Sequence, residues 1–417
     1  MQVFKFPDSF EFGVATSSLQ IEGGDKNNNW FRLSEEGKIK DGVSSFTACD
    51  HWNKIDCDIE LIKSLNCKIY KMSLEWSRIQ PKKDYFDKNA INHYRDEIKK
   101  LKENNIEPIV SLHHFSNPIW FEDIGGFTNP ESVKLFEIYT EYVLRNLGDL
   151  VTEWITINKP NTFIYNTYAN PNWRTGTKDK KKYSEAARNV IISHINSYKK
   201  IKEILLNSSK REVKIGISLD LSLISPKNNN FFDKNASNNF NNLLNETFVC
   251  GMVEGKIDNN YPFGKGKYCD FFGINYFFDY EVKFVLNLEK DFTEIEEKES
   301  NNLYIIGKKY YNQYKLPIYI TENGIDDFYD KKRIKFIYEN ILQIKKLIDD
   351  GIDVRKYCYW SLMDDFEWFD GYSKKFGLID VDFNTQKRTL KRSGEFFSLL
   401  AKNNGITEEV VDKFKNQ

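Results

Sequence analysis

The sequence predicts an α/β fold of the (β/α)8 type, a TIM barrel formed by a single domain with elaborated loops. Eight short apolar runs with strand character recur along the 417 residues, and amphipathic segments separate them. Such alternation is typical of a parallel sheet covered by helices. The length also fits, since these barrels run from roughly 200 to over 400 residues. No linker rich in Pro, Gly or Ser divides the chain, so we expect one domain over residues 1–417.

The eight runs are rich in β-branched and aromatic residues, which favours strands. In chain order they are FEFGVATS (10–17), CKIYKMSLEW (67–76), EPIVSLHH (107–114), EWITINK (153–159), VKIGISLDL (213–221), CDFFGINYF (269–277), LPIYITENG (316–324) and KYCYWSLM (356–363). Segments with helical period lie between them, namely DCDIELIKSLN (56–66), YRDEIKKLKENN (94–105), VKLFEIYTEYVLRNL (133–147) and FIYENILQIKKLIDD (336–350). Two Asn-rich stretches, 25–30 and 226–242, are interpreted as solvated loops.

The carboxyl ends of these runs carry a polar, aromatic and acidic set of side chains. In chain order the set comprises Gln20, Arg78, His113, His114, Asn158, Lys159, Asn275, Glu322, Trp360, Glu367 and Trp368. In a barrel these ends meet on one face, which is where the active sites lie. A single polar strand end means little, but a ring of them predicts an active site at this face.

Composition narrows the possible partners. The chain has 60 Lys and Arg against 61 Asp and Glu, and this near-neutral balance gives no reason to expect nucleic acid or a membrane surface as a partner. It has no apolar run of 18 residues, and its N-terminus, MQVFKFPDSF, is too polar for a signal peptide. We therefore expect a cytoplasmic protein whose partner is a small molecule, while nothing in the sequence predicts an oligomeric state.

The six cysteines lack C-x-x-C spacing and have no histidine at a metal-ligand spacing. This scatter predicts free thiols in a reducing compartment, with no metal site and no cofactor. Cys67, Cys269 and Cys358 fall inside apolar runs and are expected in the core.

Glu322, in YITENG, is the sharpest single candidate for chemistry. An acidic residue before Asn-Gly at a strand end is also compatible with an ordinary turn. An arginine such as Arg78 at the same barrel mouth would lower the pKa of Glu322 and keep it ionised, as a carboxylate nucleophile requires.

Beyond these single residues, seven segments together resemble glycoside hydrolase family 1, the retaining β-glycosidases. The matching segments are collinear and span essentially the whole chain: FEFGVATSSLQIEGG (10–24), LEWSRIQP (74–81), SLHHFSNPIWF (111–121), WITINKP (154–160), DFFGINYF (270–277), YITENG (319–324) and WSLMDDFEWFDGYSKKFGLIDVDF (360–383).

The resemblance implies a role for each matching residue. Glu322 would be the nucleophile that forms a glycosyl-enzyme intermediate, with Arg78 as its charge partner. Gln20, His114, Asn158 and Glu367 would hydrogen-bond the hydroxyl groups of the innermost sugar. Asn275, which ends the sixth run, would also bind the substrate. Trp360 would lie under the sugar ring and Trp368 would contact its outer hydroxyls. Family members that act on 6-phosphosugars have a different loop at Glu367, so an unphosphorylated, glucose-like sugar is favoured.

Two positions depart from the family. Its fourth strand ends in Asn-Glu-Pro, with the glutamate as general acid/base, whereas this chain has Asn158, Lys159 and Pro160. Lysine, with an ordinary pKa near 10.4, is a poor proton shuttle at neutral pH. We expect an ion pair between Lys159 and Glu322. Phe277 stands where the family usually has a tyrosine that hydrogen-bonds the nucleophile.

Three functions remain open at this point. The first is a glycosidase or transglycosidase for leaving groups that need no acid, as in plant thioglucosidases of this family, which also lack the acid/base carboxylate. The second is a catalytically silent sugar-binding protein. The third is Schiff-base chemistry at Lys159, which would require a depressed pKa. The sequence does not distinguish a natural lysine at position 159 from a deliberate substitution of the glutamate that the family has there.

Overall fold

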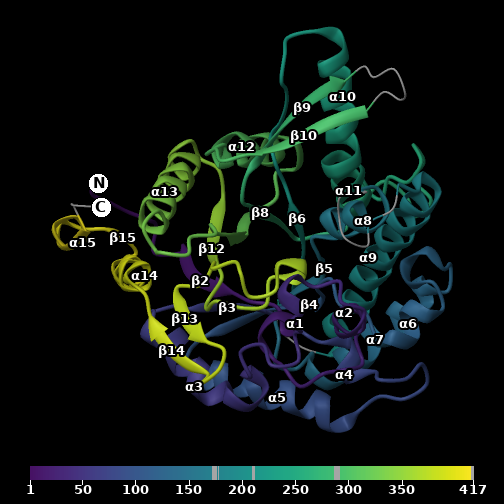
Figure 1. The fold of residues 1–417 in the computed structure, drawn as a ribbon, viewed down its shortest axis with the longest axis horizontal. Helices are drawn as coiled ribbons and strands as arrows, with labels where there is room; N and C mark the ends of the chain where they lie inside the picture. Colours follow the sequence, from purple (N-terminus) through teal and green to yellow (C-terminus); the bar gives the residue numbers. More distant parts are fainter. Residues whose placement is uncertain (171–175, 177, 209–211, 286–291, 415–417) are drawn as a thin grey trace.

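The computed structural model is a closed barrel of eight parallel strands surrounded by helices, as the sequence predicts (Figure 1). It describes residues 1–170, 176, 178–208, 212–285 and 292–414. Around the barrel the order of strands is β11-β12-β2-β3-β4-β5-β6-β8. These strands are β2 (Glu11–Ala15), β3 (Ile69–Ser73), β4 (Glu107–His113), β5 (Glu153–Asn158), β6 (Lys214–Asp220), β8 (Phe271–Tyr276), β11 (Ile318–Asn323) and β12 (Val354–Trp360). Each overlaps one of the eight predicted runs, and β12 begins two residues before its run.

The barrel closes where β12 pairs with β2, with Tyr357 opposite Phe12 and Trp360 opposite Ala15. This seam joins segments from the two ends of the chain. It also brings the short helix after β2, which carries Gln20, next to the loop after β12, which carries Glu367. The seam therefore runs through the predicted site.

An apolar layer fills the middle of the barrel. It consists of inward-facing side chains from seven of the strands: Ala15, Ile69, Ile109, Ile155, Phe271, Tyr319, Cys358 and Trp360. The eighth strand, β6, contributes Gly216, where an added Cβ would lie 2.1 Å from the ring of Phe271. The glycine thus makes room for the phenylalanine. Because side chains two residues apart share a face, Lys71 and Ser218 lie one step further toward the mouth, above this layer.

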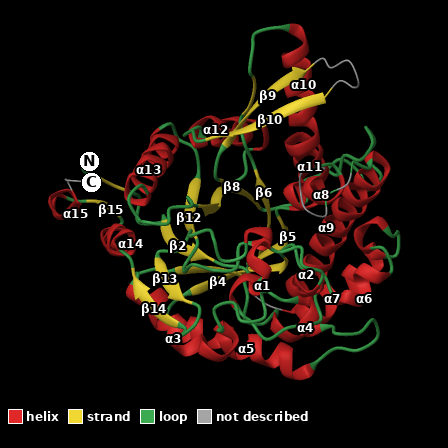
Figure 2. Cartoon of the chain, in the orientation of Figure 1, coloured by secondary structure: helices red, strands yellow, loops and turns green. Residues whose placement is uncertain are grey.

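Amphipathic helices form the outer shell (Figure 2). The longer ones are α3 (His51–Ser64), α5 (Lys88–Glu103), α7 (Ser132–Leu147), α9 (Lys180–Ser208), α12 (Leu303–Tyr314), α13 (Arg333–Asp349) and α14 (Arg392–Asn403). In α5, buried residues at helical spacing face the strands, and the Asp87 side chain accepts hydrogen bonds from the N–H groups of Asn89 and Ala90. The four predicted helical segments are confirmed in α3, α5, α7 and α13.

The short helices cover the carboxyl ends of the strands. They are α1 (Ser18–Ile21), α2 (Asn29–Glu35), α4 (Trp76–Ile79), α6 (Ile119–Asp123) and α8 (Pro160–Tyr168). The prediction of a solvated loop over residues 25–30 is wrong, since Asn28 is buried and its side chain caps α2 by accepting a hydrogen bond from the N–H of Phe31.

A small three-stranded sheet with a helix projects from the barrel beyond β6 and β8 (Figure 1). It contains β7 (Ile224–Pro226), β9 (Asp279–Val285), β10 (Phe292–Lys298) and α10 (Phe231–Asn241). The second Asn-rich stretch, 226–242, is therefore largely helical and not a loop as predicted. Asn230 caps α10, and Ala236 and Phe240 pack against Val282 of β9, so a few apolar residues at helical spacing outweigh the polar composition.

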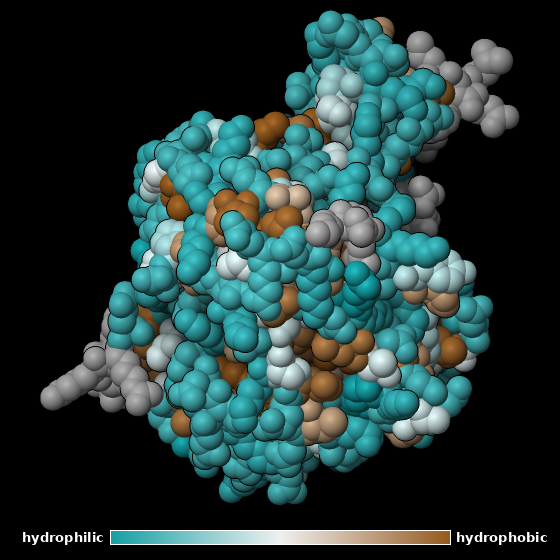
Figure 3. Space-filling model, turned by 90° about the vertical axis from the view of Figure 1, so that its left-hand side faces the viewer, coloured by the Kyte–Doolittle hydropathy of each residue, from teal (hydrophilic) through white to brown (hydrophobic). Residues whose placement is uncertain are grey.

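The two ends of the chain meet on one side of the barrel, where β1 (Phe4–Lys5) pairs with β15 (Gly405–Ile406) (Figure 1). Cys67, Cys269 and Cys358 are buried, as predicted. The face in Figure 3 is mostly hydrophilic, with hydrophobic residues in small groups. Among the helices that the structure describes, none is long and apolar enough to cross a membrane.

Candidate active site

Glu322 lies at the mouth of the barrel, at the end of β11, and its side chain is fully buried. Two ammonium groups contact it, one from Lys71 of β3 and the other from Lys159, which follows β5. Lys71 Nζ donates to Oε1 at 2.6 Å, and Lys159 Nζ forms an ion pair with Oε2 at 2.7 Å. The amide of Asn158 also donates to Oε1, at 2.9 Å. The predicted ion pair between Lys159 and Glu322 is thus present, together with a second one.

These contacts decide the charge of the carboxyl. Burial by itself would raise the pKa of Glu322, but the ammonium groups of Lys159 and Lys71 outweigh burial and lower this pKa to about 2. The pKa of the Lys71 ammonium is lowered by burial, which Glu322 only partly offsets. Glu322 is therefore a carboxylate throughout the neutral range, as a nucleophile must be.

Lys159 is held in place by the backbone and by two aromatic rings. It is the N-cap of α8 in a left-handed conformation, with φ of 45°, and Pro160 begins the helix. Its Nζ lies 4.0 Å from the ring centroid of Phe277 and 5.5 Å from that of Trp360. Burial would lower the pKa of Lys159, but the carboxyl groups of Glu322, Asp220 and Glu367 together raise it. Lys159 is accordingly a fixed cation.

Gln20 and Glu367 face each other across the barrel seam. Gln20 Nε2 donates to Glu367 Oε2 at 3.0 Å and to Asp365 Oδ1 at 3.1 Å. Burial raises the pKa of Glu367 to about 7, opposed by the nearby Lys159 ammonium. Burial and the Glu367 charge also raise the pKa of Asp365. This cluster offers a carboxylate and an amide side by side, a pattern that suits vicinal hydroxyl groups.

Three rings form the apolar wall of the same pocket. The centroid of the His114 ring lies 5.7 Å from that of Trp360 and 5.9 Å from that of Trp368. Burial keeps the pKa of His114 well below its ordinary value, so this ring is neutral and can donate or accept one hydrogen bond. His113, in contrast, points away from the mouth and bonds Asn117 among the packed rings of the outer shell.

Asn158 and Asn275 belong to one buried polar network below Glu322. Asn158 Oδ1 accepts from Lys71 at 3.0 Å and from Ser218 Oγ at 2.7 Å. Asn275 Oδ1 accepts from Thr321 Oγ1 at 2.7 Å, and its amide donates to Ser218 Oγ. The network fixes the amide orientations, so Asn158 presents its Nδ2 to Glu322 and to His114.

The prediction that Arg78 is the charge partner of Glu322 is wrong. Arg78 lies in α4, beyond the end of β3, where its Nε pairs with Glu22 at 2.8 Å and its Nη2 donates to the carbonyl of Gly23. Its guanidinium lies over the ring of Trp52. The partner of Glu322 from this part of the chain is Lys71.

The sequence contained a signal for Lys71 that was missed. A lone lysine in the middle of the apolar run CKIYKMSLEW is unusual, and its spacing of two from Ile69 predicts that both point into the barrel. Inside a barrel such a charge requires a partner of opposite sign. Asp220 and Asp365, which also lie near the mouth, were missed as well. No site residue was assigned to the run 213–221, and the segment with Asp365 was interpreted by Trp360, Glu367 and Trp368.

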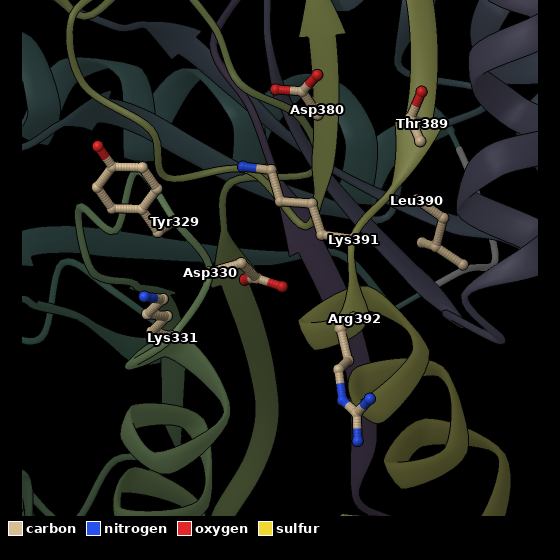
Figure 4. Close-up of a pocket in the computed structure, with 8 residues that line it drawn as sticks. All are labelled: Tyr329, Asp330, Lys331, Asp380, Thr389, Leu390, Lys391 and Arg392. Carbon is tan, nitrogen blue, oxygen red and sulfur yellow. The ribbon is translucent and has the colours of Figure 1, made fainter. Parts of the chain in front are cut away.

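Another cavity lies away from this site, near the start of α14 (Figure 4). It has a volume of about 560 Å³ and is lined by Tyr329, Asp330, Lys331, Asp380, Thr389, Leu390, Lys391 and Arg392. Two of these residues already have partners of opposite charge, since Lys391 Nζ donates to Asp364 and Asp330 forms an ion pair with Arg333. A smaller cavity of about 150 Å³ borders the mouth, where Trp30 and Phe115 contact Trp368. Among the described residues, no group of three or more His, Cys, Asp or Glu side chains is arranged to hold a metal ion.

Known proteins are similar to this chain in sequence and in fold. The profile of "Glycosyl hydrolase family 1" matches residues 2–305 and 297–406. Beta-glucosidase A of Thermotoga maritima is 32% identical, over 98% of this chain and 100% of the relative. A beta-glycosidase from Pyrococcus horikoshii superposes with a TM-score of 0.89 at 33% identity, over 99% of this chain and 98% of the other. A beta-glucosidase from Thermotoga maritima in complex with glucoimidazole superposes with a TM-score of 0.85 at 30% identity, over 96% of this chain and 100% of the other.

Proposed function

The chain belongs to glycosyl hydrolase family 1, and from this premise we propose that it is a β-glucosidase-like retaining hydrolase of unphosphorylated β-glycosides. One observation carries the proposal: Glu322 is a buried carboxylate at a strand end of the barrel, with its pKa lowered to about 2. In the first step its oxygen attacks the anomeric carbon and forms a glycosyl ester. In the second step water releases the sugar.

The surrounding side chains support a sugar with free hydroxyl groups. Gln20 and Glu367 provide donors and an acceptor, while Trp360 provides the flat apolar surface that the face of a pyranose ring requires. Asp365 lies beside Glu367, so a phosphate group here would meet two carboxyl groups. This arrangement favours a neutral, glucose-like ring.

The lysine at position 159 restricts the range of leaving groups that we expect the protein to release. The leaving oxygen cannot take a proton from this fixed cation at a useful rate, because the pKa of Lys159 is raised. We expect the fastest reaction with glycosides whose leaving groups depart as stable anions, or sugar transfer to an acceptor other than water.

A second function, sugar binding without turnover, is favoured by one observation. Both oxygens of Glu322 are engaged by ammonium groups, which reduces the reactivity of the carboxylate toward carbon. Schiff-base chemistry at Lys159 has less support, since it needs a depressed pKa, and the pKa of Lys159 is raised instead.

Covalent labelling separates these functions. Incubation with 2,4-dinitrophenyl 2-deoxy-2-fluoro-β-glucoside, which needs no acid, should add one fluoroglucosyl group to Glu322, detected by intact mass and peptide mapping. Sugar binding by calorimetry with no adduct would instead support the silent sugar-binding protein. Borohydride trapping of a carbonyl substrate on Lys159 would support the Schiff base.

The variant Lys159→Glu tests the role of the lysine. It places a carboxyl group where the proton donor is missing, and general acid–base catalysis typically contributes about 10² to 10⁴ in rate. We expect kcat/KM for phenyl β-glucoside to rise, by as much as this range if no other group donates the proton, while the value for the dinitrophenyl β-glucoside changes little. An unchanged rate for phenyl β-glucoside would mean that another residue, such as Phe277, limits the reaction.

A further inference from the structure

We propose that Asp220 exchanges the proton with the leaving oxygen and with water, taking over from the neighbouring strand the task that Lys159 cannot perform. The proposal rests on the proposed glycosidase function and deepens it. Nothing in the sequence-based assignment of the site included Asp220, which ends β6 at the barrel mouth.

Strand register places Asp220 at the level of the nucleophile. Asp220 is opposite Asn275, and Asn275 is opposite Glu322, so the three residues form one row across β6, β8 and β11. Neighbouring strands are about 4.8 Å apart, so the two acidic Cα atoms are separated by roughly 10 Å. Ser218, two residues earlier on β6, points into the barrel, where it bonds Asn158 and Thr321. Asp220 has the same orientation, which brings its carboxyl group closer to Glu322 than the Cα atoms are.

Three hydrogen bonds to the start of α8 hold Asp220 in this position. The amide of Asn161 donates to the carbonyl of Asp220 at 2.6 Å and accepts from its N–H at 3.2 Å. The hydroxyl of Thr162 donates to Oδ2 at 2.9 Å. Within the described residues these bonds engage Oδ2 and the main chain, which leaves Oδ1 of this partly buried side chain for a proton. The same helix begins at Lys159, so Asp220 and Lys159 are fixed relative to each other.

The charges around Asp220 suit a group that first gives and then takes a proton. Burial raises the pKa of its carboxyl, the Lys159 ammonium and the Thr162 hydroxyl lower it, and the Glu322 charge raises it. Glu297 of β10 and Tyr280 of β9 are the other ionisable groups affected by its charge. When Glu322 becomes an ester it loses its charge, and Asp220 and Glu367 are the carboxyl groups left beside the Lys159 ammonium. The pKa of Asp220 then falls as the proton leaves.

Each step forms one bond to the anomeric carbon, breaks another and moves one proton. A Glu322 oxygen bonds to the anomeric carbon while the bond from that carbon to the leaving oxygen breaks. The leaving oxygen keeps the electron pair and receives the Asp220 proton, which gives an alcohol or phenol and the Asp220 carboxylate. Water then bonds to the anomeric carbon, its proton passes to Asp220, and the ester bond breaks with its electrons returning to Glu322.

The test is Asp220→Asn assayed with two aryl β-glucosides. For phenyl β-glucoside, which needs an acid, we expect kcat/KM to fall by about 10² or more. For the dinitrophenyl β-glucoside, kcat/KM stays within about twofold of wild type, but kcat falls because water is no longer deprotonated. Azide, which needs no base, should restore this kcat and yield β-glucosyl azide.

Two further variants sharpen the result. Asp270→Asn removes a carboxyl at the other end of β6 and β8, where Asp270 accepts hydrogen bonds from the N–H of Ile215 and the hydroxyl of Tyr198. This variant should leave the ratio of the kcat/KM values for the two aryl β-glucosides unchanged. In the Lys159→Glu background the new carboxyl takes over, so Asp220→Asn should no longer lower the phenyl β-glucoside rate.

Labelling of Glu322 distinguishes failure of this inference from failure of the proposed function. The dinitrophenyl fluoroglucoside requires no acid, so it should label the wild type and Asp220→Asn at similar rates. If the wild type is not labelled, the glycosidase function is wrong. Two outcomes would refute the role of Asp220 although the wild type is labelled: Asp220→Asn does not lower phenyl β-glucoside turnover, or the wild type does not turn over phenyl β-glucoside. In either case Asp220 has no part in proton transfer, and the proposed glycosidase function stands.

Discussion

The pKa of Glu322 should depend mainly on Lys159, and Lys159→Met tests this because methionine has a similar length without the charge. The ammonium nitrogen lies 2.7 Å from Oε2. Two unit charges at this distance interact by about 6 kcal/mol at an effective dielectric constant of about 20. At about 1.36 kcal/mol per pKa unit this equals about 4.5 units. Removal of the cation should therefore raise the pKa of Glu322 from about 2 to about 6 or higher.

The rate of labelling by dinitrophenyl fluoroglucoside reports this pKa, because only the carboxylate attacks. With the reagent at a saturating concentration, where the affinity change caused by Glu367 does not enter the rate, the wild-type rate should be flat from pH 4 to 8, since the Glu322 pKa of about 2 lies below this range. In Lys159→Met the rate should be lower at pH 5 than at pH 8 by roughly tenfold or more, as a pKa near 6 leaves about a tenth of the carboxyl ionised.

Lys356→Met is the matched control. Lys356 is another barrel lysine paired with a carboxylate, since its Nζ lies 2.7 Å from Glu153 at the opposite end of the barrel. This variant should keep the flat profile even if its melting temperature falls. A flat profile down to pH 4 in Lys159→Met would refute the assignment of the low Glu322 pKa to the Lys159 charge.

Two other variants test the rest of the site. Lys71→Met breaks a fully buried ion pair and should lower the free energy of unfolding by about 3 to 5 kcal/mol, measured by urea denaturation; a loss below about 1 kcal/mol would show that Glu322 does not depend on this partner. Glu367 has a raised pKa of about 7, so its acceptor is lost by protonation and affinity for a neutral sugar should decrease as pH falls through 7. Glu367→Gln should bind roughly 10 to 100 times more weakly at pH 8, from the loss of about 1.5 to 3 kcal/mol, and should lack this pH dependence in calorimetry.

The strands and most of the pocket could be predicted because they depend on local pattern. Runs such as LPIYITENG contain enough apolar residues to form a barrel strand, and the residue that ends the run must lie near the mouth. The helix α10 was missed because four of its eleven residues are asparagine, and its few apolar contacts involve β9, a strand that lies some forty residues further along the chain.

The orientation of individual side chains was harder to predict. Arg78 lies seven residues after Lys71, beyond the end of β3, where strand alternation no longer applies and a short helix turns it toward Glu22. His113 and His114 are adjacent, so one must point outward, and the sequence does not indicate which. Only the registers of β6, β8 and β11 reveal that Asp220 is level with Glu322.

The seam between β12 and β2 has a consequence for the synthesis of the protein. Tyr357 is opposite Phe12, 345 residues earlier in the chain. At a translation rate of about 5 to 20 residues per second, β2 waits roughly 20 to 70 s for its partner. Gln20 and Glu367, which meet across the seam, are likewise separated until the last barrel strand has emerged. A nascent chain should therefore have no affinity for the sugar until then, so a fluorescent glucose-like inhibitor would mark the moment at which the newly made barrel closes.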